Sequence, residues 1–116
     1  MRHSVKGTKF GRKTGDRRNF IKSLETNLIL EGGIQTTTAR AKEIRPRVEK
    51  LVTIAKKQDL ASLKMLIKKL PEKAAFKLFH DIAPKYGERK GGYLRIMKTA
   101  TWRKRDGADL VNIEFV

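Results

Sequence analysis

The sequence predicts an α+β fold in which four helices pack with a small mixed three-stranded sheet, preceded by an extended basic N-terminal arm. Apolar residues recur at helical spacing through the first two-thirds of the chain, and towards its end they alternate with polar residues as in strands. The length of 116 residues fits one domain. We therefore expect an arm over residues 1–15 and a single α+β globular domain over residues 16–116.

The arm and the first helix differ in their sequence patterns. Residues 1–15 contain three glycines and show neither strand nor helix periodicity, which favours an extended segment. A first helix is predicted over residues 17–31, where apolar residues return every three or four positions. Thr14 or Asp16 could cap its start, and Gly32 supplies the left-handed residue that commonly ends a helix.

The next segment predicts a strand followed by a second helix. Residues 34–37 are short and rich in β-branched side chains, as strands are. The apolar pattern of residues 38–57 is helical, and Thr36 or Thr37 could cap this helix. Pro46 lies inside it and lacks the amide hydrogen that a helix interior uses. We expect a kinked continuous helix, with a break before Pro46 as the alternative.

Two amphipathic helices follow, over residues 59–69 and 72–83. Each is followed by a proline, Pro71 or Pro84, which we expect to stop the helix because proline cannot continue the hydrogen-bond ladder. The four helices together carry most of the apolar residues that can form a core.

The last part of the chain predicts a β-hairpin. Residues 93–98 form one candidate strand, and residues 110–116 form another, in which every second residue from Val111 to Phe115 is apolar. The dipeptide Asp106-Gly107 between them is typical of a tight turn.

The charge of the chain points to a polyanionic partner. It contains 28 lysines and arginines and 12 aspartates and glutamates, a net charge of +16. Much of this charge is concentrated in residues 1–18 and 85–105. Self-repulsion at this density opposes folding unless a polyanion neutralises it, and lysine or arginine contacts to phosphates release condensed counterions. We expect the partner to be a nucleic acid. The alternatives are an anionic membrane and a charged surface that serves only to keep the protein soluble.

Signals for catalysis and for metal binding are weak. The chain has no cysteine, which excludes disulfides, thiolate metal sites and cysteine nucleophiles. It has two histidines, scattered carboxylates and no phosphate-loop or nucleophile-elbow pattern. Glu43 and Arg47, four residues apart, are read as an ordinary helix surface pair. We expect no enzyme activity, cofactor, metal or small-molecule substrate, and no apolar run is long enough for a membrane span.

The candidate RNA-binding residues are cations in the arm, at the helix starts, in the loop before the hairpin and in the hairpin itself. For the cations at the start of the second helix, the alternative interpretation is a solvated helix face that binds no RNA. The predicted set is Arg2, His3, Lys6, Lys9, Arg12, Lys13, Arg17, Arg18, Arg40, Lys42, Arg45, Arg47, Arg89, Lys90, Arg95, Lys98, Arg103, Lys104 and Arg105. Three aromatic residues close to these cations could stack on unpaired bases: Tyr86, Tyr93 and Trp102. Trp102 could instead pack under the hairpin.

Several motifs in this order resemble the L17 family of bacterial large-subunit ribosomal proteins. The resemblance runs almost from end to end, and its most specific parts are Thr36-Thr37 followed by Arg40-Ala41-Lys42-Glu43, then Gly91-Gly92-Tyr93-Leu94-Arg95-Ile96. The segment Arg105-Asp106-Gly107-Ala108 near the end is also similar to the family. It implies a non-enzymatic constituent of the large ribosomal subunit that binds large-subunit rRNA, supports subunit assembly and translation, and contacts neighbouring ribosomal proteins. It also implies a cytoplasmic location on the ribosome.

Two other classes of protein remain as alternatives. A histone-like or regulatory DNA-binding module would bind duplex DNA and rRNA with similar affinity, but the sequence shows no helix-turn-helix or zinc-finger spacing. An enzyme acting on nucleic acid would need a metal-dependent activity, against which the scattered acidic residues argue.

Overall fold

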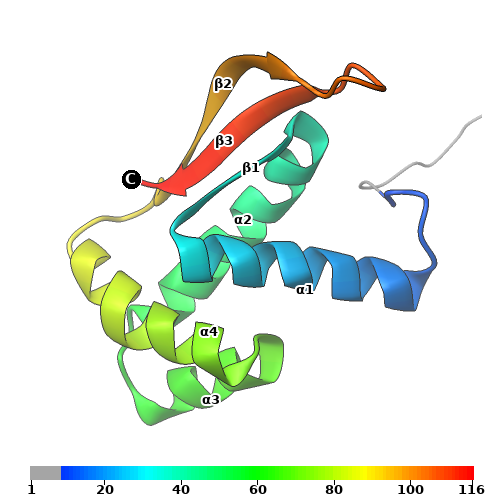
Figure 1. The fold of residues 1–116 in the computed structure, drawn as a ribbon. Coiled ribbons are helices and arrows are strands. Elements are labelled where there is room, and N and C mark those ends of the chain that lie inside the picture. The colour runs from blue at the N-terminus through cyan, green and yellow to red at the C-terminus, as the bar shows by residue number, and fades with distance from the viewer. Residues whose placement is uncertain (1–8) are drawn as a thin grey trace, which may run out of the picture.

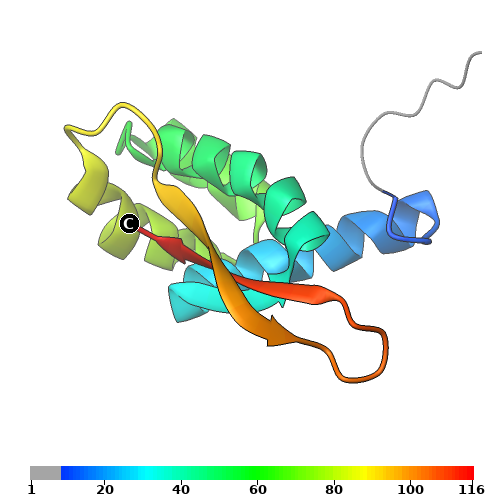
Figure 2. The ribbon, with the colours of Figure 1, turned by 90° about the horizontal axis from the view of Figure 1, so that it is seen from above.

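A computed structural model describes residues 9–116 of the chain. The second helix, α2 (Thr38–Ala55), lies at the centre of the structure, and its main contacts are with four other helical segments and all three strands. The sheet lies above α2 in Figure 1, α1 crosses in front of it, and α3 and α4 lie below. Figure 2, seen from above, shows the hairpin of the last two strands extending beyond the helices at one end of the molecule.

The first helix, α1 (Thr14–Glu31), begins inside the segment predicted as arm. Its N-cap residue is Lys13, whose side chain makes no capping hydrogen bond, so neither Thr14 nor Asp16 is the cap that the sequence predicted. Asp16 lies in the first turn, where a carboxylate interacts favourably with the helix dipole. The predicted stop is confirmed: Gly32 has a φ of 80°, and its N–H donates to the carbonyl of Leu28 at 2.8 Å.

The second helix is continuous through Pro46, so the alternative of a break is excluded. Pro46 lies on the exposed side of α2, where water can bond the carbonyl that has lost its helical donor. The buried side carries Ala41, Ile44 and Val48 and is unaffected. Thr37 caps the helix as predicted, because its hydroxyl accepts a hydrogen bond from the Arg40 N–H at 3.5 Å.

The third and fourth helices are α3 (Leu60–Lys69) and α4 (Glu72–Lys77). The helical path does not end at Pro84 as predicted. It passes from α4 through a π-helical turn, Leu78–Ile82, into a 3₁₀ turn, Ala83–Tyr86. Pro84 stands at the beginning of the 3₁₀ turn, a position whose N–H has no partner inside the turn, so proline is tolerated there.

The sheet is antiparallel throughout rather than mixed. Its strands are β1 (Gly33–Thr37), β2 (Leu94–Trp102) and β3 (Asp109–Phe115), in the order β1-β3-β2. The two outer strands do run in the same direction, but β3 lies between them and pairs antiparallel with each. The described sheet therefore contains no parallel pair, and the prediction of a mixed sheet is wrong in this respect.

The hairpin follows the prediction in its turn and differs in its length. Gly107 has a φ of 67°, as the Asp-Gly pair predicts. Strand β2 continues four residues beyond the expected end at Lys98, with an irregular register between Lys98 and Trp102. The core lies between the sheet and the helices, and its largest fully buried side chains include Leu28, Ile44, Val48, Leu66, Leu78, Tyr93 and Ile113.

Candidate nucleic-acid interface

Two arginines from separate parts of the chain, Arg12 and Arg40, lie over the ring of Phe20. Together with Arg103, whose charge acts on Arg40, we call them the arginine cluster. The Cζ atom of Arg12 lies 3.8 Å from the centroid of the Phe20 ring, and that of Arg40 lies 4.9 Å from it. Arg103 comes from the hairpin and acts electrostatically on Arg40. Both ribbon views place the hairpin tip and the starts of α1 and α2 at the same end of the molecule (Figures 1 and 2).

The end of the arm is docked on α1 by an aromatic contact. The rings of Phe10 and Phe20 meet edge to face with their centroids 5.4 Å apart. The guanidinium of Arg12 donates to the carbonyl of Phe10 at 2.8 Å, which holds the arginine against the ring. Phe10 and Arg12 therefore hold the segment before α1 against that helix.

The cluster is strongly cationic. The pKa of Arg40 is lowered first by its partial burial and then by the positive charges of Arg103 and Arg12. Within residues 9–116, no carboxylate forms an ion pair with Arg12 or Arg40. Arg103 differs, because its guanidinium pairs with Asp106 in the hairpin turn and lowers the pKa of that carboxyl group.

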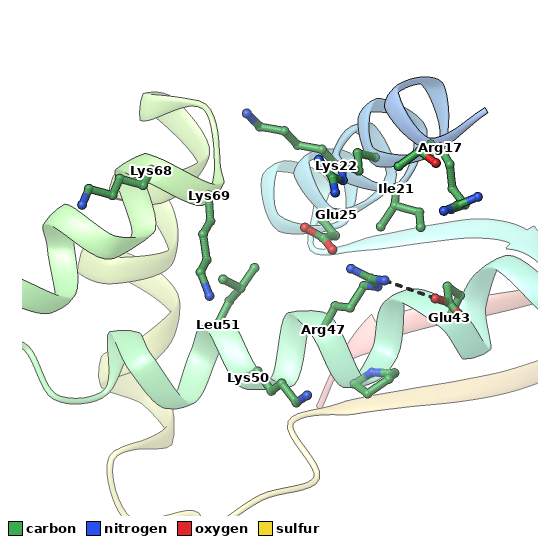
Figure 3. Close-up of a pocket in the computed structure, with 13 residues that line it drawn as sticks. Arg17, Ile21, Lys22, Glu25, Glu43, Arg47, Lys50, Leu51, Lys68 and Lys69 are labelled. Atoms are coloured by element: carbon green, nitrogen blue, oxygen red, sulfur yellow. Dashed lines mark hydrogen bonds and ion pairs between the residues drawn. The ribbon is translucent and has the colours of Figure 1, made fainter. Parts of the chain in front are cut away.

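A second basic surface is a groove of about 820 Å³ between α1, α2 and α3 (Figure 3). Its cations are Arg17, Arg18 and Lys22 from α1, Arg47 and Lys50 from α2, and Lys68 and Lys69 from α3. Four of these were missed by the sequence predictions: Lys22, Lys50, Lys68 and Lys69. The α3 lysines stand in its last turn, where cations are expected because they complement the helix dipole. Only the packing of α3 beside α1 and α2 brings them into the groove.

Two carboxylates line the same groove. Glu43 accepts a hydrogen bond from Arg47 at 3.4 Å, which confirms the predicted surface pair. Glu25 is 8% exposed, and burial raises the pKa of its carboxyl group, against the opposing effect of Arg47, Lys69 and Lys22. Cations outnumber acids in the groove, so its electrostatic potential favours an anionic ligand.

Four of the predicted RNA-binding arginines are engaged in ion pairs. Besides Arg47 and Arg103, Arg45 pairs with Glu49 at 3.1 Å, and Arg95 pairs with Glu114 at 2.7 Å across β2 and β3. Their charges are partly neutralised within the protein. Exposed cations of the predicted set without such a pair are Lys9, Arg12, Lys13, Arg18, Lys42, Arg89, Lys90, Lys98, Lys104 and Arg105. The predicted residues Arg2, His3 and Lys6 lie outside the described residues.

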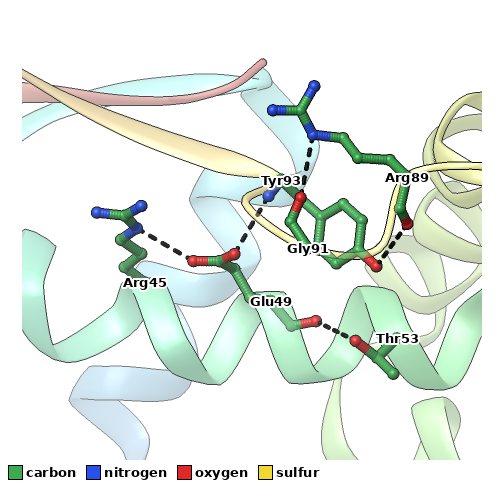
Figure 4. Close-up of polar contacts among 6 residues, drawn as sticks. All are labelled: Arg45, Glu49, Thr53, Arg89, Gly91 and Tyr93. Atoms are coloured by element: carbon green, nitrogen blue, oxygen red, sulfur yellow. Dashed lines mark hydrogen bonds and ion pairs between the residues drawn. The ribbon is translucent and has the colours of Figure 1, made fainter.

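The loop that carries Arg89 and Lys90 is held by a polar network (Figure 4). Glu49 accepts a hydrogen bond from the Tyr93 N–H at 3.1 Å, and the Tyr93 hydroxyl donates to the Arg89 carbonyl at 3.1 Å. The Arg89 Nε donates to the carbonyl of Gly91 at 3.0 Å. These bonds fix the loop backbone while both basic residues remain exposed.

The predicted stacking residues have different environments. Tyr86 and Tyr93 are 7% and 2% exposed, and their rings pack together with centroids 5.4 Å apart. Their hydroxyls bond within the protein, Tyr86 donating to the Val116 carbonyl at 2.6 Å. Neither ring offers a face to a base, so the stacking prediction is wrong for both. Trp102 is 64% exposed and does not pack under the hairpin.

The remaining surface shows few features of other kinds of site. In the described part of the chain, no three histidine, aspartate or glutamate side chains gather where they could hold a metal ion. None of the helices described combines the length and apolar character of a membrane span. The two basic surfaces and the exposed Trp102 are thus the features that carry functional information.

Known proteins resemble the chain over its whole length. The family profile described as ribosomal protein L17 matches residues 20–116. A protein of Persephonella marina named large ribosomal subunit protein bL17 is 47% identical over 118 residues, covering 100% of this chain and 95% of that protein. The protein of the same name in Hydrogenobaculum sp. is 44% identical, covering 100% of this chain and 99% of the relative. The one in Acidobacterium capsulatum is 41% identical, covering 100% and 72%.

Proposed function

The chain belongs to the ribosomal protein L17 family, and from this premise we propose that it binds the RNA of the large ribosomal subunit through its arm, helix ends and hairpin. Its relatives bear the name large ribosomal subunit protein bL17. The chain is accordingly a structural protein of the ribosome and not an enzyme.

The observation that carries the proposal is the convergence of cations from separate elements, most of them without an ion pair in the described chain. Arg12 and Arg40 lie against one ring, and seven cations line the groove between the helices. Bringing like charges together costs free energy in the isolated protein, and a phosphate backbone offsets that cost. Because these cations project from the arm, the helix starts and the hairpin, they suit an irregularly folded RNA better than a straight duplex.

In this proposal the globular domain docks on rRNA and the arm makes further contacts with it. The cations of residues 1–15, of the loop at Arg89 and Lys90, and of the hairpin contact phosphates. Trp102 stacks on an unpaired base. The proposal includes neighbouring ribosomal proteins as partners, a supporting role in subunit assembly and a cytoplasmic location on the ribosome.

The test measures the affinity of the purified full chain for a transcript of large-subunit rRNA and for duplex DNA of similar length across a salt series. We expect rRNA to bind at least about tenfold more tightly. The double variant Arg12→Ala and Arg17→Ala should bind rRNA more weakly while its circular dichroism spectrum stays unchanged. If each arginine contacts one phosphate, the slope of log affinity against log salt should fall by about 1.4–1.8.

A charge-matched control is the double variant Lys73→Ala and Lys85→Ala, because both lysines are exposed and lie outside the two basic surfaces. It should retain nearly the wild-type affinity. Equal losses in the two double variants would mean that only total charge matters and would refute the assigned surfaces. Equal affinity for DNA and rRNA would favour a DNA-binding module instead.

A further inference from the structure

We infer that Phe20 is a positioning residue that holds Arg12 and Arg40 together as one binding site for a single RNA phosphate, and that this phosphate links the arm to the globular domain. The inference rests on the proposed RNA-binding function and goes beyond it. It assigns a role to an uncharged side chain and joins two arginines in one contact.

The first argument is geometric. Because their Cζ atoms lie 3.8 and 4.9 Å from the same centroid, the two guanidiniums are less than about 9 Å apart. A guanidinium carbon lies about 4 Å from the phosphorus that it contacts through charge-assisted hydrogen bonds. Both guanidiniums can contact one phosphate when their carbons lie within about 8 Å of each other, a separation inside the range that the two distances to the Phe20 ring allow.

Contacts with Phe20 hold the side chains of Arg12 and Arg40 near each other. The quadrupole of an aromatic ring attracts a guanidinium that lies over its face, which favours this rotamer of the arginine over many others. Arg12 is fixed further by its bond to the Phe10 carbonyl, and Phe10 packs on Phe20. Preorganising the two guanidiniums reduces the conformational entropy lost when a phosphate binds.

The third argument is electrostatic. Neither arginine forms an ion pair within the described residues, although four other arginines of the chain do. Arg103 adds positive charge close to Arg40, and its own charge is shared with Asp106. A divalent or monovalent anion at this point removes the repulsion, whereas a cationic or apolar partner would not.

The position of the cluster also explains the link to the arm. Arg12 lies at the end of the arm, before α1, and Arg40 lies in the first turn of α2. A phosphate bound by both ties the arm to the domain, so that residues before Arg12 start from a fixed point on the RNA surface. Such a tie resembles bivalent binding, because the first contact raises the effective concentration of the arm.

The experiment uses the full chain, the rRNA transcript and the variant Phe20→Leu, which removes the aromatic ring and leaves the net charge at its wild-type value. We expect the affinity for rRNA to fall about three- to tenfold and the salt slope to decrease by up to about one phosphate contact. The matched control is Phe76→Leu, since Phe76 is exposed on α4 and packs only on His80 among aromatic partners in the described chain. It should bind as the wild type does.

A double-mutant cycle keeps the inference falsifiable even if Phe20→Leu lowers stability. If Arg12 and Arg40 share one phosphate, the double variant Arg12→Ala and Arg40→Ala should lose less affinity than the product of the single losses. Independent losses, or unchanged binding by a folded Phe20→Leu variant, overturn the shared site but leave rRNA binding in place. Absence of rRNA binding by the wild-type chain instead overturns the proposed function.

Discussion

The variant Glu49→Ala tests how the loop before β2 is fixed. In the structure one carboxylate oxygen of Glu49 accepts from the Arg45 Nε at 3.1 Å, and the other accepts from the Tyr93 N–H at 3.1 Å (Figure 4). Tyr93 precedes β2 and is 2% exposed, so its N–H has neither a ladder partner nor free access to water. Removing the carboxylate leaves this donor without an acceptor.

The two bonds contribute different amounts. A buried donor left without a partner costs about 1–3 kcal/mol, whereas an exposed ion pair such as Arg45–Glu49 contributes at most about 1 kcal/mol. We expect Glu49→Ala to lower the free energy of unfolding by about 2 kcal/mol. With an unfolding entropy of about 2.1 cal/mol/K per residue, this corresponds to a fall in Tm of roughly 8 °C for this chain length.

Urea and thermal unfolding, followed by circular dichroism, provide the assay. The control Arg45→Ala removes the same ion pair but keeps the Tyr93 bond, so its loss should stay below about 1 kcal/mol. Glu49→Gln retains an acceptor oxygen and should fall between the two. If Glu49→Ala is no less stable than Arg45→Ala, water replaces the carboxylate and the assigned role of Glu49 is wrong.

Three further variants test the carboxylate in the groove, the cap of α2 and the exposed indole. Because burial raises the pKa of Glu25, the folded protein binds its proton more tightly than the unfolded chain, and stability falls as pH rises from the ordinary glutamate pKa through the raised one. Urea midpoints should therefore show Glu25→Gln gaining on the wild type as the pH rises above the ordinary glutamate pKa; parallel pH profiles would contradict this. Thr37→Ala should lower stability by about 0.5–1 kcal/mol through loss of the cap, and Thr37→Ser should restore it. Trp102→Ala should change stability by less than about 0.5 kcal/mol and weaken rRNA binding by about 1–3 kcal/mol if a base stacks on the indole. Trp102→Phe should retain part of the affinity. An unchanged affinity for Trp102→Ala would show that the residue lies outside the interface.

The local features of the fold were predictable because short-range chemistry determines them. Gly32 ends α1, Thr37 caps α2 and the Asp106-Gly107 pair closes the hairpin, each within a few residues of its partners. The N-cap of α1 was predicted wrongly because Lys13, with no side-chain bond, takes this position one residue before Thr14. Helix ends shift by a residue or two at little cost.

The antiparallel sheet depends on contacts between distant parts of the chain. Period-two alternation identifies a strand but does not say which strand pairs with it. The pairing of Ile34 with Ile113 brings β3 between β1 and β2, and no local signal in either strand specifies this order. The burial of Tyr86 and Tyr93 follows from the same non-local packing. From the sequence alone, an aromatic residue beside cations can either pack in the core or stack on a base.

The sequence shows how much positive charge the candidate interface carries. It shows only in part which of these cations form ion pairs within the protein. Spacing of four residues predicts the pair of Glu43 with Arg47, whereas the pair of Arg95 with Glu114 depends on the β2–β3 register. Arg12 and Arg40 are 28 positions apart and meet only because the arm end and α2 both reach Phe20.

This difference decides which cations carry the most information about function. A paired arginine has a structural explanation within the protein, and losing it changes stability as well as binding. An aromatic ring explains why Arg12 and Arg40 lie where they do. It does not explain why both residues are charged, because neither forms an ion pair within the described residues. The proposed RNA partner accounts for the charge of Arg12 and Arg40, because a phosphate supplies both the opposite charge and hydrogen-bond acceptors that match two guanidinium groups.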